Sequence, residues 1–382
     1  KVADMMSIKR SIILLFVLLF STVTPSFANH NEAEVHKEVS HSENKDSHDA
    51  AAEESEEFNA AEFILHHVVD AHDWHIYGEG ENAIHLHLPI ILIDGGLVMF
   101  SSGDFNVVHS AHGHDYRTTA DGTYAIAHEK IYKTLDGELQ FTEGHPVNEK
   151  PLDFSITRNV TSMLISVVLI LLVFFKVGAS YKKRGVDSAP KGLQSFMEPL
   201  VLFVRDEIAL PNIGEKKYKR YMPYLLTAFF FIWLNNLLGL VPFFPGGSNL
   251  TGNIAFTLVM AVFTLLYTVL SGNKDYWKHI LTPPVPKALY PIMIPVEIIG
   301  VFTKPFALMI RLFANITAGH IVVLAFICII FINKSIGWAG LSVPMALFIG
   351  VLELLVAFLQ AFIFTMLTAL FIGSAVEEHE HH

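Results

Sequence analysis

The stretch IMIPVEIIGVFTKPFALMIRLFANITAGHIVVLAFICIIFI, residues 292–332, decides the fold of this chain. It is about twice as long as the 20 or so apolar residues that cross a bilayer as a helix. A second apolar run of similar length, residues 341–376, follows after a short turn. At about 1.5 Å per residue each helix would exceed 50 Å, against a hydrocarbon core of about 30 Å. We therefore expect a strongly tilted or bent antiparallel helical hairpin.

Three further apolar segments bring the expected number of membrane crossings to five. They span residues 156–177, 221–244 and 253–271, and each is long enough for one crossing. The composition agrees, with 52% hydrophobic residues, 16% charged residues and a mean hydropathy of +0.44. Lysines and arginines gather at 182–191, 216–220 and 274–287, which places these loops in the cytoplasm, the carboxyl terminus inside and the amino terminus outside. An amphipathic stretch at 193–210 should lie along the cytoplasmic interface.

The amino-terminal part divides into three expected regions. Residues 1–28 have the form of a secretory signal peptide, with Lys9 and Arg10 before an apolar core and Ala28 at a small-residue cleavage site. Residues 29–57 are rich in His and Glu and should be disordered; most of the acidic excess behind the net charge of −11 lies there. Residues 58–151 predict a small exported α+β domain. In it, runs at 83–88 and 90–93 indicate strands, and 61–72 is amphipathic.

Histidines concentrate outside the membrane part of the sequence. Fifteen of the 20 lie between residues 30 and 145. Two clusters could ligate a metal in principle: His66, His67, His72 and His75 form one, and His109, His112 and His114 form the other. No cysteine or paired carboxylate completes a closed zinc site, so solvated histidines are the favoured interpretation and no metal or other cofactor is expected.

The first long apolar segment carries polar residues whose insertion into lipid costs free energy, which points to a functional role or a partner. Arg311 lies near the middle of that segment, where an arginine costs at least about 2.5–3.5 kcal/mol. Asn315 follows four residues later on the same helical face, on which alanines leave room for another helix. His320 is nine residues from Arg311, which is about 180° around a helix, so the two should serve different surfaces.

The second long segment carries Glu353 and Gln360, seven residues apart and so on one helical face. A carboxylate in lipid needs a partner or water. His320 is the one histidine within the predicted spans, so we expect His320 and Glu353 to meet across the hairpin and to line an aqueous proton path. The alternative is two separately solvated residues.

These residues also carry a family resemblance. The run KPFALMIRLFANITAGH at 304–320, together with LQAFIFTMLT at 359–368, resembles the signature of subunit a of the F-type ATP synthase membrane sector. The resemblance covers residues 152–382. It implies a non-catalytic stator subunit of a proton channel, with two offset half-channels, in the cell inner membrane. Its implied partners are the c-ring, the peripheral-stalk subunit b, the remaining ATP synthase subunits and the lipid bilayer. Nucleic acid is not among them.

The resemblance also implies roles for particular residues. Arg311 corresponds to the stator arginine that faces the carboxylates of the rotor, with Asn315 and Gln360 as polar neighbours, and Glu297 lies near the cytoplasmic access path. In many members glutamate stands at the position of His320 and histidine at that of Glu353. The exchange in this chain preserves one acid and one base, which favours a physical pair.

Two other classes of function remain open from the residues alone. A self-contained proton-coupled secondary transporter would usually have duplicated halves with interrupted helices, and the sequence has no such repeat. A metal-handling membrane protein would use the exported histidines as a collecting segment. No Gly-rich phosphate loop is present, so we expect no directly bound nucleotide.

Overall fold

The computed structural model describes residues 64, 69–77, 84–111, 114–134, 137–142, 145–185, 189–241, 246–283, 285–286, 289–333 and 335–377. The predicted signal peptide and the acidic segment at 29–57 lie outside the described residues. Of the amphipathic stretch at 61–72, residue 64 is helical and residues 69–72 are not.

Five helices in the described part are long and apolar enough to cross a membrane, as the sequence predicted. They are α3 (Arg158–Arg184), α6 (Tyr218–Leu240), α7 (Ile254–Ser271), α9 (Tyr290–Ile332) and α10 (Ala339–Val376). Shorter helical pieces lie between them: α4 (Leu193–Phe203), a π-helical segment (Val204–Ala209), α5 (Leu210–Ile213) and α8 (Lys274–Leu281).

The first of these helices is longer than the sequence predicted. Thr157 caps α3 by accepting a hydrogen bond from the backbone of Val160, and the helix continues to Arg184. Basic residues fill its last turn, where positive charge is favourable against the helix dipole. The helix ends at Gly185, which has a positive φ of 78°.

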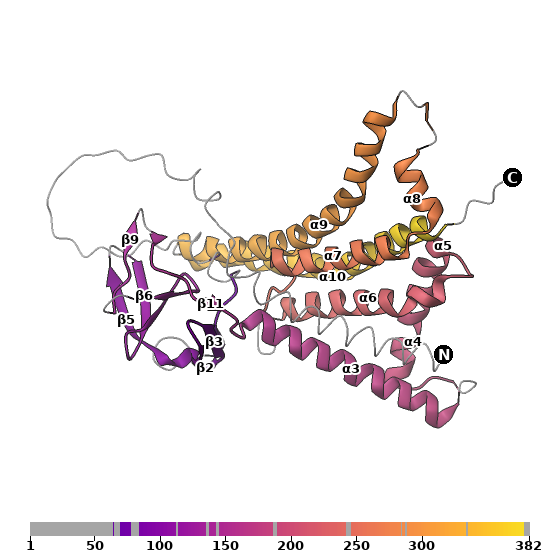
Figure 1. Ribbon diagram of the computed structural model, residues 1–382. Coiled ribbons are helices and arrows are strands. Elements are labelled where there is room, and N and C mark those ends of the chain that lie inside the picture. The colour runs from indigo at the N-terminus through magenta and orange to yellow at the C-terminus, as the bar shows by residue number, and fades with distance from the viewer. Residues whose placement is uncertain are drawn as a thin grey trace.

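Helix α10 lies at the centre of the helical part. It contacts α6, α7 and α9, while α3 packs on the other side of α6 (Figure 1). The largest core cluster fills this region, with fully buried aromatic rings at Phe229, Phe256 and Phe364. Polar side chains of Tyr224, Thr264 and Thr368 form hydrogen bonds within it.

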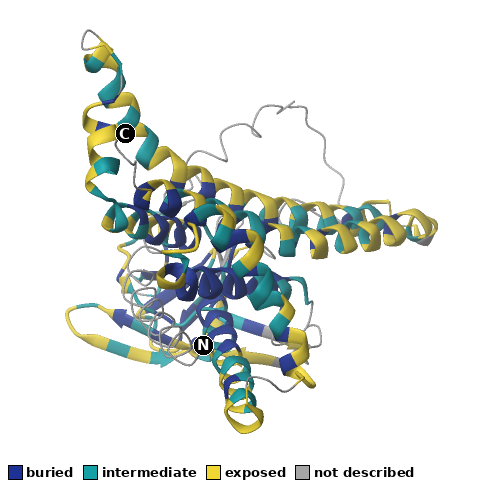
Figure 2. Cartoon of the chain, turned by 90° about the vertical axis from the view of Figure 1, so that its right-hand side faces the viewer, coloured by how far each residue is buried: buried dark blue, intermediate teal, exposed yellow. Residues whose placement is uncertain are grey.

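Helices α9 and α10 form the long hairpin predicted from residues 292–332 and 341–376. Each runs without interruption through its prolines, and a short 3₁₀ turn at Ile336–Trp338 precedes α10. Figure 1 shows most of α9 beside α10, whereas the amino-terminal part of α9 bends away from α10 toward α8. In the turned view of Figure 2 the hairpin extends away from the buried centre with mostly exposed or intermediate residues. The buried share of the hairpin is therefore confined largely to the part that meets α6 and α7.

The described residues from 69 to 153, which we call the strand domain, contain antiparallel sheets. The strands are β1 (Asp73–Tyr77), β2 (Ile84–His87), β3 (Pro89–Ile93), β4 (Leu97–Ser101), β5 (Phe105–Ala111), β6 (His114–Thr119), β7 (Tyr124–Ala127), β8 (Lys130–Lys133), β9 (Phe141–Thr142), β10 (His145–Pro146) and β11 (Leu152–Asp153). Their orders are β1-β2, β9-β10, β11-β3-β4 and β5-β6-β7-β8.

Strand β7 joins two small cores of this domain. Its residues are buried on both faces: Tyr124 and Ile126 pack with Ile90 and Leu92 of β3, while Ala125 and Ala127 belong to a second cluster. This division follows the two-residue period of a strand. Strand β11 then leads directly into α3, so the strand domain lies beyond the amino-terminal end of that helix (Figure 1).

Candidate functional site

The hairpin brings His320 of α9 and Glu353 of α10 together. The distance from His320 Nδ1 to Glu353 Oε1 is 3.8 Å, and the Glu353 side chain is 5% exposed. Gly319 makes this approach possible, because a Cβ at that position would lie 2.7 Å from Glu353 Oε1. A separation of 3.8 Å exceeds a direct hydrogen bond and is within the range of an ion-pair contact when the imidazole is protonated.

Two atoms of this pair are buried polar groups that the described part of the chain does not satisfy. His320 Nε2 and Glu353 Oε1 are both fully covered and have no hydrogen-bond partner among the described residues. Buried polar atoms are nearly always hydrogen-bonded, so each such atom calls for an explanation.

Asn315 and Gln360 form the second polar contact across the hairpin. Asn315 Nδ2 donates to Gln360 Oε1 at 2.8 Å, and Gln360 is 1% exposed. The bond joins the face of α9 that carries Arg311 to the buried side of α10. Asn315 itself remains partly open on the outer surface of α9.

Arg311 lies on an exposed face of α9. Its neighbours on that face, Ala307, Ala314 and Ala318, are also exposed, whereas Met309 and Ile316 are buried on the opposite side. Within the described part of the chain, the guanidinium has no hydrogen bond or ion pair. The chain thus presents a cation on a surface of small side chains.

Glu297 lies apart from these residues. It precedes Arg311 by 14 positions, which is about 21 Å along the axis of α9. Its neighbour is Tyr276 on α8: burial, and then the negative charge of Glu297, raise the pKa of Tyr276. The structure therefore brings together His320 with Glu353 and Asn315 with Gln360, and it leaves Glu297 near α8.

Sequence reasoning missed a set of polar residues around the loop that follows α6. Asn236 donates to the backbone of Ala357 at 3.3 Å and accepts from Thr251 at 2.9 Å. Ser248 donates to the side chain of Asn159 at 2.7 Å. The signal was present: asparagine in an apolar helix is expensive without a partner, as arginine is.

The structure gives no support to the two histidine clusters as metal centres. His66, His67 and His112, and the side chains of His75 and His114, lie outside the described residues. His72 contacts Asp153 and Glu129, and His109 Nε2 lies 3.0 Å from Thr118. No group of three or more possible ligands occurs among the described residues.

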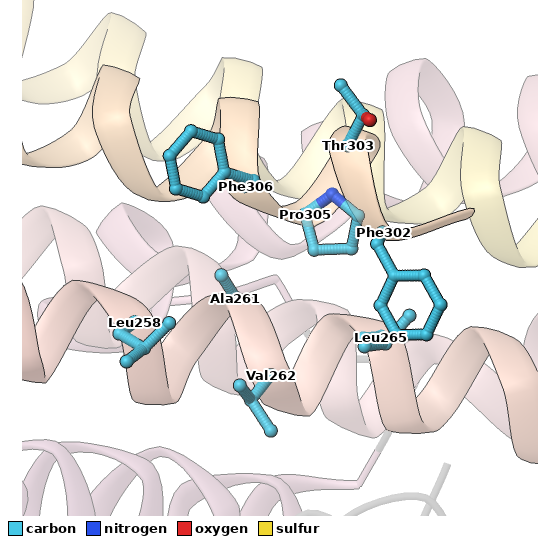
Figure 3. Close-up of a pocket in the computed structure, with 8 residues that line it drawn as sticks. All are labelled: Leu258, Ala261, Val262, Leu265, Phe302, Thr303, Pro305 and Phe306. Carbon is cyan, nitrogen blue, oxygen red and sulfur yellow. The ribbon is translucent and has the colours of Figure 1, made fainter. Parts of the chain in front are cut away.

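A groove of about 350 Å³ lies between α7 and α9, away from this site. It is lined by the apolar residues and the one threonine labelled in Figure 3, from Leu258 to Leu265 on α7 and from Phe302 to Phe306 on α9. None of the predicted site residues lines it, so the groove is separate from the polar site.

Comparison of the sequence with known proteins identifies the family of this chain. A family model described as "ATP synthase A chain" matches residues 160–373. The chain belongs to the ATP synthase A chain family. Two relatives show how far the likeness extends. "ATP synthase subunit a" of Chloroherpeton thalassium is 43% identical over 314 residues, covering 78% of this chain and 90% of the relative. "ATP synthase subunit a 2" of Prosthecochloris aestuarii is 54% identical over 311 residues, covering 78% and 93%.

The family assignment confirms the resemblance read from residues 304–320 and 359–368. The match to the A chain family covers the five long helices and stops short of the strand domain. A second family model, described as a domain of unknown function (DUF8433), matches residues 63–154. The chain is therefore a multi-pass ATP synthase A chain with an additional amino-terminal strand domain.

Proposed function

We propose that this chain is the stator subunit of an ATP synthase proton channel and that it couples proton flow to rotation of a c-ring. Membership of the A chain family supports the stator role and implies assembly with the other ATP synthase subunits. In that complex the chain carries protons and is not itself catalytic. The c-ring and the peripheral-stalk subunit b are its proposed direct partners.

In the proposed topology, residues 152–382 form a membrane domain in the cell inner membrane, with its amino-terminal side outside and its carboxyl terminus in the cytoplasm. Residues 58–151 form an exported domain, preceded by an export signal at 1–28 and an acidic segment at 29–57. Helices α9 and α10 cross the membrane with a strong tilt, because 43 and 38 residues are too long for an upright crossing.

The proposed role of Arg311 is to separate two half-channels. A fixed cation beside a rotor carboxylate lowers the pKa of that carboxylate, so the carboxylate releases its proton there. Once it moves into lipid, only its protonated form has a low free energy, so it must first load a proton from the other half-channel. Transfer of each charge is worth about 2.3 kcal/mol per 100 mV of membrane potential.

The remaining site residues are assigned to the two access routes. His320 and Glu353, with their buried unsatisfied atoms, line the outer half-channel. Asn315 and Gln360 hold the two helices together beside Arg311. Glu297, near α8, lies at the cytoplasmic access.

The observation that carries this proposal is the exposed Arg311 on a face of alanines, with no hydrogen bond or ion pair to its guanidinium from the described residues. A transporter complete in one chain would pair such a cation within its own fold, since an unpaired charge in lipid is costly. A partner that presents carboxylates in the membrane satisfies it.

The test is substitution of Arg311 in the assembled enzyme. Arg311→Ala should lower ATP-driven proton pumping by about 100-fold or more, because a buried charge contact of several kcal/mol is lost. Lys278→Ala removes an exposed cation of α8 and should leave pumping within about twofold, as expected for a surface change. Quenching of a pH-sensitive dye in inverted vesicles measures both. Normal coupled pumping in the assembled Arg311→Ala enzyme would refute the proposal.

A further inference from the structure

The amino terminus of α3 is capped by a segment of the strand domain, residues 69–72. Arg158 donates its backbone N–H to the carbonyl of Ala71 at 2.9 Å and a guanidinium N–H to the carbonyl of Val69 at 2.8 Å. Asn159 donates its backbone N–H to Asp70 Oδ1 at 3.0 Å. The first N–H groups of a helix lack partners within the helix, and a carboxylate is favoured there. Asp70 therefore acts as a cap supplied from outside the helix.

A buried cluster holds this segment in place on the strand-domain side. His72 is 5% exposed, and its ring lies 3.3 Å from Asp153 Oδ2 and 3.7 Å from Glu129 Oε2. Glu129 also accepts from the backbone N–H of His72 at 3.3 Å. Glu129 and His128 form the β7–β8 turn with positive φ at both positions, a conformation that non-glycine residues adopt at a cost. The backbone of this turn is therefore in an unfavourable conformation, and in that conformation the Glu129 carboxylate contacts His72.

The same cap connects to the membrane interior through Asn159. While its backbone binds Asp70, its side-chain oxygen accepts from Ser248 at 2.7 Å, and both residues are nearly fully buried. Ser248 belongs to the loop between α6 and α7. A Cβ placed on Gly239 of α6 would lie 3.2 Å from the carbonyl oxygen of Ser248 and 3.7 Å from His320 Nε2. The loop and the imidazole therefore share one contact surface on α6.

We propose that Asp70 is a positioning residue for the outer end of the proton route, and that the strand domain is a fixed part of its mouth. This inference rests on the proposed function, in which His320 lines the outer half-channel. By capping α3, Asp70 fixes Asn159, which fixes Ser248 and with it the loop beside His320. The strand domain thereby acts on proton entry without touching the proton path itself.

The experiment measures ATP synthesis by the whole complex in liposomes at a fixed potential while the proton concentration on the outer side is varied. Asp70→Ala removes the acceptor of the cap. It should raise the half-saturating outer proton concentration by about threefold to tenfold, the equivalent of one lost capping hydrogen bond, and leave the maximum rate within about twofold. Asp70→Asn keeps an acceptor oxygen and should remain within about twofold of the unaltered chain.

Glu149→Ala is the matched control, since it removes another carboxylate of the same domain. The Glu149 carboxylate is exposed and pairs with Lys133, and both residues are far from Asp70 in the sequence. This substitution should change neither parameter. If Asp70→Ala does not assemble, Ser248→Ala, which deletes the next link, receives the same measurement and should raise the half-saturating concentration to a similar extent.

An assembled Asp70→Ala or Ser248→Ala enzyme with a lower maximum rate and an unchanged half-saturating concentration would overturn the proposal, because a purely structural role predicts that result. Equal damage from Asp70→Asn and Asp70→Ala would also overturn it. Arg311→Ala in the same liposomes distinguishes this proposal from the proposed function. Coupled synthesis in that variant would refute the proposed function, whereas the Asp70 variants test only the effect of the strand domain on proton entry.

Discussion

Asn315 of α9 donates a hydrogen bond to Gln360 of α10, and this bond closes the polar side of the hairpin at the level of Arg311. Gln360 is almost fully buried, so its side-chain oxygen depends on Asn315. Hydrogen bonds between membrane helices contribute about 0.6 kcal/mol on average and up to about 1.7 kcal/mol. The bond therefore serves to fix the two helices in register more than to stabilise them.

The Asn315–Gln360 bond predicts a coupled pair of substitutions. Asn315→Ala should destabilise the chain in detergent by about 1 kcal/mol, and adding Gln360→Ala should cost little more, because the partner is already lost. Thermal unfolding of the single and double variants measures the coupling. Thr303→Ala, which removes a hydroxyl bound within α9 itself, is the control. Fully additive effects of the two substitutions would contradict the pairing.

Exchange of His320 and Glu353 predicts a rescue. His320→Glu places two carboxylates at contact distance and Glu353→His places two imidazoles there, and each should lower proton pumping by about tenfold or more. The double exchange restores one acid and one base 3.8 Å apart and should recover pumping to within about threefold of the unaltered chain. Dye quenching in inverted vesicles compares the three. A double variant no better than the singles would show that the contact has no role in proton transfer.

Gly319 predicts a steric effect on the same pair. A methyl group in Gly319→Ala would lie 2.7 Å from Glu353 Oε1, so the carboxyl must move away. Proton pumping should fall by about threefold to tenfold, as expected when a proton-transfer contact is misplaced, while assembly persists. Gly300→Ala on the same helix meets nothing within 4 Å and should stabilise α9 by up to about 1 kcal/mol with normal pumping. Equal pumping in both variants would exclude the clearance role of Gly319.

His72 predicts a pH dependence of the strand domain. Burial alone lowers its pKa, but hydrogen bonds and charges from Asp153 and Glu129 outweigh this and raise the pKa of His72 from 6.5 to about 10. Its stabilising contribution is therefore complete below about pH 6.5 and is lost as the pH rises toward 10. The carboxyl groups of Glu129 and Asp153 have lowered pKa values, so their contribution is lost in acid, below their ordinary values of 4.5 and 3.8.

The measurement is hydrogen exchange of β5–β8 amides in the whole chain, corrected for the intrinsic rate. Between pH 6.5 and 10 the opening free energy should fall by about 2–4 kcal/mol in the unaltered chain, because one unit of pKa shift is worth about 1.4 kcal/mol. His72→Gln should give a flat profile over that range. The same slope in both chains would mean that another group controls the opening.

Much of the hairpin could be predicted from the sequence. Its length followed from two apolar runs of about 40 residues, and the separation of Arg311 from His320 followed from 100° per residue along a helix. Helical periodicity also placed Glu353 and Gln360 on one face. These predictions succeed because apolar length and helical period are local properties of the chain.

The connection to the strand domain could not be predicted in the same way. Asn159 binds Asp70 and Ser248, each 89 positions away in the sequence, through single hydrogen bonds. No periodic pattern marks such contacts, and Asp70 lies between Val69 and Ala71 in a stretch without a recognisable motif. The sequence also gave no reason to expect that a buried histidine in the strand domain would pair with two carboxylates.

The unbroken course of α9 restricts how this route can change. Glu297, Arg311 and His320 lie on one continuous helix, so a single residue inserted or deleted between any two of them would rotate one against the other by about 100° and shift it by about 1.5 Å. An acid and a base can be exchanged between α9 and α10 without moving the helices, but an insertion in α9 would displace the side chains of these three residues. We therefore expect the spacing of these three positions to be more constant among relatives than the residues that occupy them.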